Sequence, residues 1–212
     1  MDAATGREKW RFKGGDDPLI HNQIGFQSSA AIADGVVFTG CRDSNVYAID
    51  AATGKEKWRF NNQMSWVNTS PAVVKGKVLF ATSDSSLFHL ADAVTGKPVL
   101  RQQLKAYVFS SPAVAGDAVY LGVLNGSLEA RDLNTGELLW EYQTEASRQN
   151  RNWVLTADRK FNGPMIFTTA WREAATSSLD LQSTVGSFFS SPLIVNGVVY
   201  AGSTDGNMYA IE

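Results

Sequence analysis

The sequence has few of the residues from which disulfides and soft-metal sites are built. Cys41 is the one cysteine among 212 residues, so no disulfide can form within the chain. We expect a small buried thiol there, because only Arg42 stands beside it as a cation that could activate it. The two histidines, His21 and His89, stand far apart in the sequence. No zinc cluster, phosphate loop or Ser/His/Asp grouping can be recognised.

The sequence also lacks an excess of positive charge and any long apolar run. Its 19 Lys and Arg face 21 Asp and Glu, and no basic block occurs, so the electrostatic footprint of a nucleic-acid-binding protein is missing. No apolar run approaches the ~18 residues that a membrane-spanning helix needs. Residues 1–15 contain no apolar segment typical of a secretion signal. We therefore expect no nucleic-acid partner and no membrane span, and the chain itself indicates no compartment.

The helical period of 3.6 residues is missing too, and a longer repeat takes its place. The copies read SSAAIADGVVFTGCRDSNVYAIDAATGKEKW, TSPAVVKGKVLFATSDSSLFHLADAVTGKPVL, SSPAVAGDAVYLGVLNGSLEARDLNTGELLW and SSPLIVNGVVYAGSTDGNMYAIE. Ala30, Pro71 and Pro112 hold one position in three consecutive copies, and Pro192 holds it in the fourth after an insertion. Self-similarity at a fixed period is typical of repeat architectures.

Each copy has the pattern of short β-strands. Two apolar runs flank a glycine turn in AIADGVVF, NVYAID forms a third run, and EKWRF alternates polar and apolar residues. Four short strands every ~40 residues fit the blade of a β-propeller. We predict an all-β protein with one propeller domain over residues 1–212, built from four-stranded antiparallel blades. The repeats are 28–60, 69–104, 110–144 and 188–212 plus 1–13, with an inserted, lid-like segment at 145–187.

The two ends of the sequence fit together. The chain ends MYAIE and begins MDAATGREKWRF, which together repeat the internal phrase YAIDAATGKEKWRF. The N-terminal segment would thus supply the fourth strand of the last blade and hide strand edges. Small residues near the turns, such as Ala48 and Gly54, favour thin blades and a ring of many blades. We therefore expect a homodimer in which two half-rings form one eight-bladed propeller, each N-terminal segment completing the other chain's last blade; a closed four-bladed ring and an open half-ring are the alternatives.

One phrase, Ala-x-Asp-x-x-Thr-Gly-x-x-x-Trp, recurs once per copy. Its glycine suits a turn position with positive φ, its Asp and Thr can bond turn amides, and its Trp can cover part of the neighbouring blade. In the second copy Leu90 and Leu100 replace Ala and Trp. The phrase is carried by Ala48, Asp50, Thr53, Gly54 and Trp58, by Ala130, Asp132, Thr135, Gly136 and Trp140, and across the two chain ends by Ala210, Asp2, Thr5, Gly6 and Trp10.

These phrases resemble the tryptophan-docking motifs of the pyrroloquinoline-quinone-like (PQQ-like) β-propeller repeat family. DDPLIHNQIGFQSS and GCRDSNVYAID are similar to the C-terminal half of longer bacterial members. The resemblance covers all of the chain except the insert and one loop. It implies half of a propeller of the family's usual seven or eight blades, and a periplasmic or secreted location if the native gene is longer. The family includes quinone-dependent dehydrogenases and non-catalytic scaffolds, among them the lipoprotein that helps to assemble bacterial outer-membrane proteins.

We favour a non-catalytic scaffold or binding module without a cofactor or metal, which presents loops to an unknown protein partner. A quinoprotein dehydrogenase is the alternative; it would need a divalent cation held by carboxylate and amide oxygens and a carboxylate base. The adjacent cysteines that the resemblance implies for such a site are missing. A truncated structural fragment without activity is a third interpretation.

Two irregular stretches are candidates for binding. Residues 14–27 hold Asp16, Asp17, His21, Asn22 and Gln23, for which loop hydrogen bonding explains more than a metal site does. Segment 145–187 is a lid on the rim or a decayed fifth blade. Because Trp and Arg dominate binding hot spots, we name a candidate contact patch, with packing as the alternative for each member: His21, Arg42, Trp66, Trp153, Trp171 and Arg172.

A further pair of polar residues recurs once per blade, beginning at Ser28, Thr69, Ser110 and Ser190. A catalytic nucleophile would occur once in the chain. We therefore predict that these residues are structural and cap the ends of inner strands with side-chain hydrogen bonds.

Overall fold

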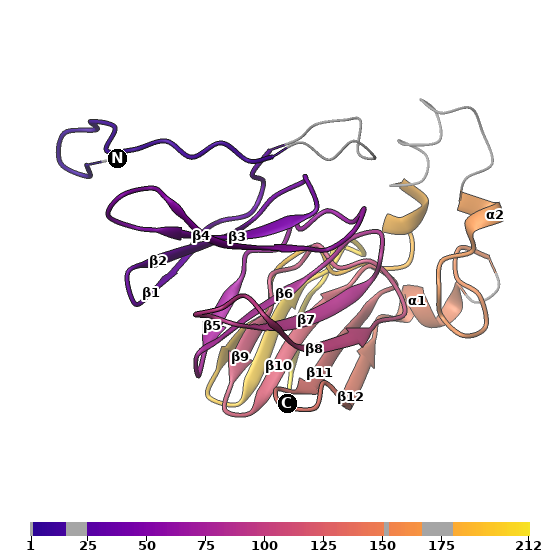
Figure 1. The fold of residues 1–212 in the computed structure, drawn as a ribbon. Helices are drawn as coiled ribbons and strands as arrows, with labels where there is room; N and C mark the ends of the chain where they lie inside the picture. Colours follow the sequence, from indigo (N-terminus) through magenta and orange to yellow (C-terminus); the bar gives the residue numbers. More distant parts are fainter. Residues whose placement is uncertain (1, 16–24, 151–152, 167–179) are drawn as a thin grey trace.

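The computed structural model describes residues 2–15, 25–150, 153–166 and 180–212, and it contains four antiparallel sheets that follow one another along the chain. We call each sheet a blade (Figure 1). Blade 1 is β1 (Ala31–Ala33), β2 (Val36–Gly40), β3 (Asn45–Asp50) and β4 (Glu56–Asn61); blade 2 is β5 (Ala72–Val74), β6 (Lys77–Ala81), β7 (Leu87–Asp92) and β8 (Pro98–Gln103); blade 3 is β9 (Ala113–Ala115), β10 (Ala118–Val123), β11 (Ser127–Asp132) and β12 (Leu138–Gln143); blade 4 is β13 (Leu193–Val195), β14 (Val198–Gly202) and β15 (Met208–Ile211).

The first two strands of each blade form a tight hairpin. In blade 1 the turn residues Asp34 and Gly35 both have positive φ, at 48° and 72°. Lys75 and Gly76 repeat this geometry in blade 2. Two consecutive residues with positive φ match the right-handed twist of the flanking strands, which is why glycine is the second turn residue in blades 1, 2 and 4. In blade 3 the order is reversed: Gly116, with a φ of 62°, comes first and Asp117 follows.

The turn between the third and fourth strands is built by the recurring phrase. In blade 1 the Asp50 carboxylate accepts hydrogen bonds from the hydroxyl and the amide of Thr53, both at 2.8 Å. These two bonds lower the pKa of Asp50. Gly54 follows with a φ of 72°, and its amide donates to the carbonyl of Asp50. Residues 2–7 form the same turn, because Asp2 accepts from Thr5 and Gly6 has a φ of 70°.

Blades 1 and 2 are joined by an aromatic ring that lies on a glycine, and between blades 2 and 3 the Leu100 side chain takes the place of the ring. A Cβ added to Gly96 of blade 2 would lie 2.6 Å from the ring of Trp58, which stands on β4 of blade 1. The indole Nε1 of Trp58 also donates to the carbonyl of Ala93 at 3.1 Å. Only glycine leaves room for a ring this close. Ala48, the alanine of the phrase, is the cross-strand partner of Trp58 within blade 1.

The serine pairs bind twice, once within a blade and once between blades. Ser110 Oγ donates to the carbonyl of Gly122 and accepts from its amide, so it ties the chain that enters blade 3 to the end of β10. Ser28, Thr69 and Ser190 make the equivalent pair of bonds in their own blades. The predicted strand-end caps are present in all four blades.

The second residue of each pair forms what we call the serine ladder, a series of bonds from one blade to the next. The Ser29 amide donates to Ser70 Oγ, the Ser70 amide to Ser111 Oγ and the Ser111 amide to Ser191 Oγ, each at 2.9 Å. Beside this ladder the innermost strands β1, β5, β9 and β13 contact one another in that order. These contacts place the blades in a row, with blade 1 and blade 4 at its ends.

Apolar clusters fill the gaps between blades. Phe38 and Val46 of blade 1 pack against Val78 and Phe80 of blade 2. A second cluster, which includes Leu90, joins blades 2 and 3, and a third, with Leu128 and Val199, joins blades 3 and 4. The interior of the protein thus consists of inter-blade layers, as expected when each sheet buries both faces against its neighbours.

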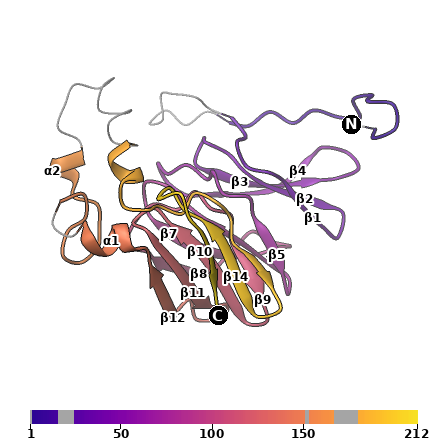
Figure 2. The same cartoon turned by 180° about the vertical axis from the view of Figure 1, so that it is seen from behind.

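The N-terminal segment lies at the blade 1 end of the row. Trp10 covers Gly54 and donates to the carbonyl of Ala51 at 2.9 Å, and the Phe12 ring lies 5.1 Å from that of Tyr47. Blade 4 has three strands, and within the described residues nothing pairs with the outer edge of β15. The expected fourth strand is thus not supplied by the same chain. Figures 1 and 2 show the two chain ends well apart.

The insert between blades 3 and 4 is partly described. It contains α1 (Glu145–Gln149), α2 (Gly163–Ile166) and one isolated bridge between Leu155 and Phe161. These elements enclose a small cluster that includes Val154, Ile166 and Val185. The described part of the insert therefore has its own core and holds no strand ladder.

Replacing Trp58 with alanine tests the junction between blades. We expect Trp58→Ala to lower the free energy of unfolding by about 3 kcal/mol, because a ring packed on Gly96 is lost. Leu100→Ala, at the equivalent junction on Gly136, should cost less, and the exposed control Val99→Ala on the same strand should stay within about 0.5 kcal/mol. Urea unfolding measures all three, and equal values for Trp58→Ala and Val99→Ala would contradict the junction.

Candidate functional site

Chemically active side chains occupy one position of the third strand in every blade. The register places Tyr47, His89, Glu129 and Tyr209 at equivalent points of β3, β7, β11 and β15. We call these four residues the third-strand column. His89 contacts Phe60 of blade 1 and Tyr209 contacts Tyr142 of blade 3, so their side chains face the preceding blade. Each member lies on a different blade, so these titratable side chains are spread along the row and do not form one cluster.

His89 is held between aromatic rings. Its imidazole stacks on Phe80 at a centroid distance of 4.9 Å and meets the edge of Phe60 at 5.3 Å. Both ring nitrogens are buried and have no hydrogen-bond partner among the described residues. Burial lowers the pKa of His89 from its ordinary 6.5 to about 4, and the nearby Arg101 charge acts in the same direction. The imidazole is therefore neutral at pH 7 and packs as an aromatic ring.

Glu129 is a buried carboxylate held by a neighbouring strand residue. Its Oε2 accepts from Arg131 Nε at 2.7 Å, and the residue is fully buried. Burial raises the pKa of Glu129, although the Arg131 charge opposes the shift. Sequence reasoning missed this pair, but the signal was present: when the repeats are aligned, this column reads Tyr, His, Glu and Tyr where an apolar strand residue would be ordinary.

A buried arginine fixes the insert to blade 3. Arg159 Nη2 donates to Ser147 Oγ at 2.7 Å and to Ser127 Oγ at 3.1 Å. Asn125 Nδ2 donates to the carbonyl of Arg159, and Glu141 lies 3.6 Å from its Nε. These contacts join a loop of the insert, α1 and two strands of blade 3. The insert is thereby placed on a firm base, a role that sequence analysis did not assign to Arg159.

Cys41 and Tyr47 meet the N-terminal segment. The Gly15 amide donates to Asp43 Oδ2 at 2.8 Å and to the Tyr47 hydroxyl at 2.9 Å. Burial raises the pKa of Cys41 to about 12, with the Asp43 charge adding to the effect. The thiol is thus buried and protonated at pH 7, as expected for a packing cysteine.

The loops after the second and fourth strands share one side of the row with the insert; we call it the insert face. Equivalent hydrogen bonds join these loops within single blades. The Asn62 amide donates to the carbonyl of Ser44 in blade 1, and the Thr144 amide donates to the carbonyl of Gly126 in blade 3. In Figure 1 α1 and α2 of the insert lie at the right of the molecule. The opposite side carries the regular Asp-Thr-Gly turns. Irregular chain is therefore concentrated on the insert face.

Three members of the predicted contact patch can be placed on the insert face. Arg42 is buried, and its guanidinium stacks 3.5 Å above the ring centre of Trp66. Trp153, in the insert, is 49% exposed. His21, Trp171 and Arg172 lie outside the described residues, as do Asp16 and Asp17. The structure thus brings Arg42 and Trp66 together, and the patch as a whole stays a prediction.

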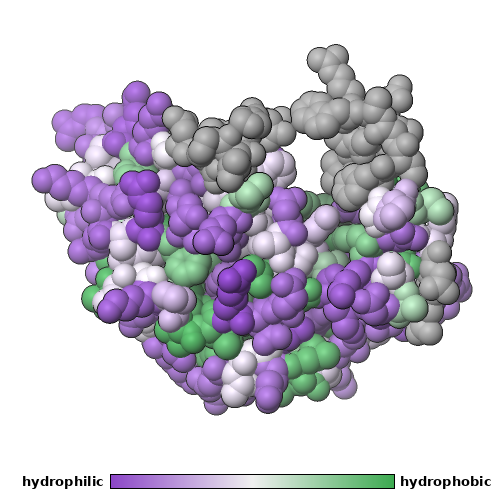
Figure 3. Space-filling view, turned by 45° about the vertical axis from the view of Figure 1, so that its right-hand side comes forward, coloured by the Kyte–Doolittle hydropathy of each residue, from purple (hydrophilic) through white to green (hydrophobic). Residues whose placement is uncertain are grey.

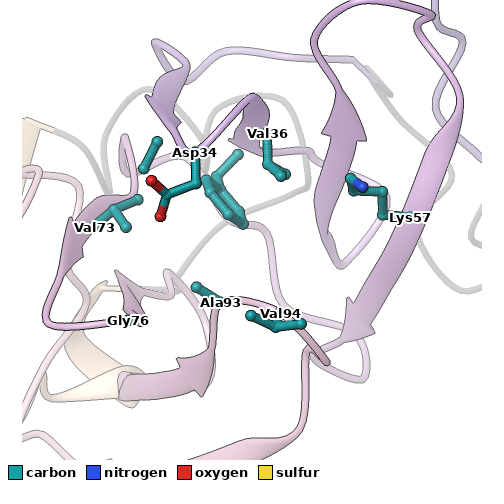
Figure 4. A pocket seen from close by; sticks show the side chains of 9 residues that line it. Asp34, Val36, Lys57, Val73, Gly76, Ala93 and Val94 are labelled. Atoms are coloured by element: carbon teal, nitrogen blue, oxygen red, sulfur yellow. The ribbon is translucent and has the colours of Figure 1, made fainter.

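An apolar groove of about 250 Å³ lies between blades 1 and 2. Val36, Val73 and Val94 form much of its wall, while Asp34 and Lys57 lie on different sides of it (Figure 4). Its floor is part of the inter-blade layer described above. The side of the molecule in Figure 3 is largely hydrophilic, with scattered apolar patches of this kind.

No three His, Cys, Asp or Glu side chains among the described residues come together as metal ligands. None of the helices in this part of the chain has the length and apolar character needed to cross a bilayer.

The fold and its repeated contacts define a class of protein: a β-propeller of tryptophan-docked blades, of which this chain contains a row of four. A family model for outer membrane protein assembly factor BamB, a set of PQQ-like repeats, matches residues 1–61 and 42–163. The chain therefore belongs to the PQQ-like β-propeller repeat family, on the BamB-like side.

Individual proteins support the same assignment. BamB of Shewanella oneidensis is 27% identical over 150 residues, which cover 63% of this chain and 38% of that protein. Quinohemoprotein alcohol dehydrogenase ADH-IIG of Pseudomonas putida is 28% identical over 111 residues, or 47% of this chain and 15% of that enzyme. The crystal structure of BamB from Moraxella catarrhalis superposes with a TM-score of 0.61 at 19% identity and covers 87% of this chain and 49% of that one. The chain thus spans less than half the length of these relatives.

Replacing His89 with phenylalanine tests its environment. The pKa of His89 is lower in the folded state than in the unfolded state, so the unfolded state binds more protons between pH 6.5 and 4. The free energy of unfolding therefore decreases as the pH is lowered from 6.5 to 4. His89→Phe removes this loss. We expect the variant to gain on the natural protein by about 3 kcal/mol as the pH falls from 7 to 4. Urea unfolding at several pH values measures the gain, and parallel curves for the two proteins would show that His89 is not buried as described.

Proposed function

We propose that the protein is a non-catalytic scaffold that binds a protein partner. The observation that carries this proposal is the distribution of the third-strand column. Each blade carries one member of the column, and its side chain faces the preceding element of the row. A catalytic site instead needs its groups to converge on one point. Stacking engages His89, and the Arg131 pair engages Glu129. The polar residues of the repeats serve the frame itself.

We assign partner binding to the insert face. Loops on a rigid frame are a common source of binding surface, and this face carries the insert. Trp153 and Met64 are 49% and 56% exposed there, and the Arg42 guanidinium already lies on Trp66. Rigid aromatic side chains lose little entropy on binding, so they suit the centre of an interface. Arg159 keeps the insert in place before a partner arrives.

The relatives suggest where such a scaffold acts. BamB is named for the assembly of outer membrane proteins. We propose that this chain also works in the bacterial envelope, on proteins of outer-membrane assembly. Its partner would be a component of that machinery, bound through the insert face.

Complementation tests this proposal. In a strain of the native host that lacks the gene, we expect lower levels of folded outer-membrane proteins, restored by the natural gene and not by a Trp153→Ala, Met64→Ala double variant. Val94→Ala is the matched control, because Val94 is exposed on the opposite side of the row. Full rescue by the double variant would contradict binding at the insert face, and normal levels in the deletion strain would contradict the envelope role.

The enzyme alternative rests on the match to the quinohemoprotein alcohol dehydrogenase. It predicts that the protein binds pyrroloquinoline quinone with calcium and reduces an artificial dye when given an alcohol. We expect neither a change in the quinone absorbance nor dye reduction. Turnover in this assay would overturn the scaffold proposal.

We also propose that the scaffold works as a homodimer in which two rows of four blades make one ring. The chain corresponds to about half of a BamB propeller, with 49% of the Moraxella chain covered. Light scattering should then give about 46 kDa, twice the chain mass of 23.0 kDa.

A further inference from the structure

The two ends of the row carry complementary halves of a blade junction. We propose that a second copy of the chain docks head to tail on blade 4, and that residues 2–15 of that copy become its fourth strand. This inference specifies the contacts of the proposed homodimer and rests on it. It follows from comparing the ends with the three complete junctions inside the chain.

The first unmatched half is a glycine without a ring. An added Cβ would meet Trp10 at Gly54, Trp58 at Gly96 and Leu100 at Gly136. A Cβ added to Gly6 would meet no atom of the described residues within 4 Å, although the turn around it is fully formed. Residues 2–7 therefore form a docking turn on which no ring of the described residues lies.

The second unmatched half is a ring without a glycine. Trp140 is the next docking residue after Leu100, on the fourth strand of blade 3. Trp10 and Trp58 each donate to the carbonyl one residue after the turn aspartate, at Ala51 and Ala93. Among the described residues, no such carbonyl faces the Nε1 of Trp140. In the proposed junction the carbonyl of the second copy's Ala3 accepts this bond, and Gly6 of that copy lies under the ring.

The edge of β15 fits the same segment in register. Within blade 1, Ala48 pairs with Trp58 and Val46 with Phe60. The equivalent pairs across the junction are Ala210 with Trp10 and Met208 with Phe12. Ala210 is exposed, whereas Ala48 and Ala130 are fully buried at the same point of their blades. A fourth strand on β15 removes this difference.

The apolar faces at the two ends also continue the series of inter-blade interfaces. On blade 4 the face turned away from blade 3 exposes Leu193, Tyr200 and Met208, at 62%, 38% and 74%. Register equivalents of these residues, such as Phe38 and Val46, are buried against the next blade. On blade 1 the opposite face exposes 70% of Ile32 beside a groove of about 300 Å³ that is lined by Phe26 and Val37. Contiguous apolar surface of this kind marks an interaction site.

The serine ladder has the polarity that a head-to-tail junction requires. Each amide donates toward the blade of higher number, from Ser29 through Ser111. The row therefore ends at blade 4 with Ser191, whose amide has no acceptor among the described residues, and begins with the Ser29 hydroxyl at blade 1, and both residues are exposed. In the junction the Ser191 amide of one copy donates to the Ser29 hydroxyl of the other.

The occupant is a second copy because residues 2–15 are already committed to their own blade 1. Trp10 on Gly54 and the Gly15 amide on Asp43 hold the segment at that end of the row. Blade 4 is the last blade in the series of contacts between innermost strands, at the other end of the row. Two copies related by a two-fold axis leave no half unmatched, since each chain offers one segment and one edge.

Cysteine pairing tests the register. Asn45 pairs with Asn61 in blade 1, so Asn207 of one copy should face Lys13 of the other. We expect the single variants Asn207→Cys and Lys13→Cys, mixed by co-refolding and oxidised, to give a covalent species of about 46 kDa, twice 23.0 kDa. Neither variant alone should give it, and neither should Asn207→Cys mixed with Lys75→Cys. Failure of the Asn207–Lys13 pair to cross-link in a confirmed dimer would overturn the strand exchange and leave the homodimer intact.

A glycine substitution tests the docking turn. Gly6→Leu should block the Trp140 ring and raise the dissociation constant of the dimer by about ten-fold or more. Gly76→Leu is the control, because Gly76 has the same positive φ, 71° against 70°, and equally open surroundings, but lies in a hairpin turn within the row. Equal dissociation constants for the two variants would refute the junction.

The oligomeric state separates the remaining outcomes. A natural protein of 23.0 kDa by light scattering would overturn both the homodimer and this junction. A 23.0 kDa species in which the double variant Asn207→Cys, Lys13→Cys forms an internal disulfide would show instead a four-bladed ring closed within one chain. The scaffold role is judged separately by complementation with Trp153→Ala, Met64→Ala.

Discussion

The structure depends on one contact, an apolar side chain from the fourth strand of a blade lying on the glycine of the next blade's turn. The turn must present bare backbone at this point, and its positive φ also favours glycine. The junction between blades 2 and 3 shows which partner is obligatory: Leu100 replaces the tryptophan and still approaches within 2.8 Å of a Cβ added to Gly136. The tryptophan can thus be replaced by a smaller apolar side chain, whereas the glycine is kept. The spacing of the blades, the inter-blade cores and the serine ladder all follow from this approach.

Local chemistry explains why the blades could be predicted from the sequence. Asp50, Thr53 and Gly54 bond within a few residues of one another, so the turn they form is visible in the sequence itself. The strand-end caps were predictable because a residue that recurs once per blade serves the blade. The fate of residues 2–15 was harder, since the sequence shows that they match a fourth strand but not which copy of the sheet receives them. That choice depends on how far a row of blades curves.

Some residues of the candidate site could be predicted from the sequence, and others could not. His89 and Glu129 could have been singled out by aligning the repeats, because a polar residue in a strand column stands out. The anchoring role of Arg159 could not, because its partners Ser127 and Ser147 lie on different elements and meet it only in the folded chain. The stacking of Arg42 on Trp66 is likewise a product of two loops that come together on the insert face. Single-residue patterns thus located the frame, and long-range contacts created the surface on it.

The polarity of the serine ladder gives the row of blades two unlike ends, one that offers a hydrogen-bond donor and one that offers an acceptor. Objects of this kind close into a ring only if the rotation from one copy to the next divides a full turn evenly, and otherwise they grow into an open helical polymer. That rotation is set by the thickness of the inter-blade layers, hence by side chains such as Phe38, Phe80 and Leu90. In the proposed head-to-tail assembly, core residues far from either end would therefore govern whether copies of this chain stop at a closed ring or continue as a fibre.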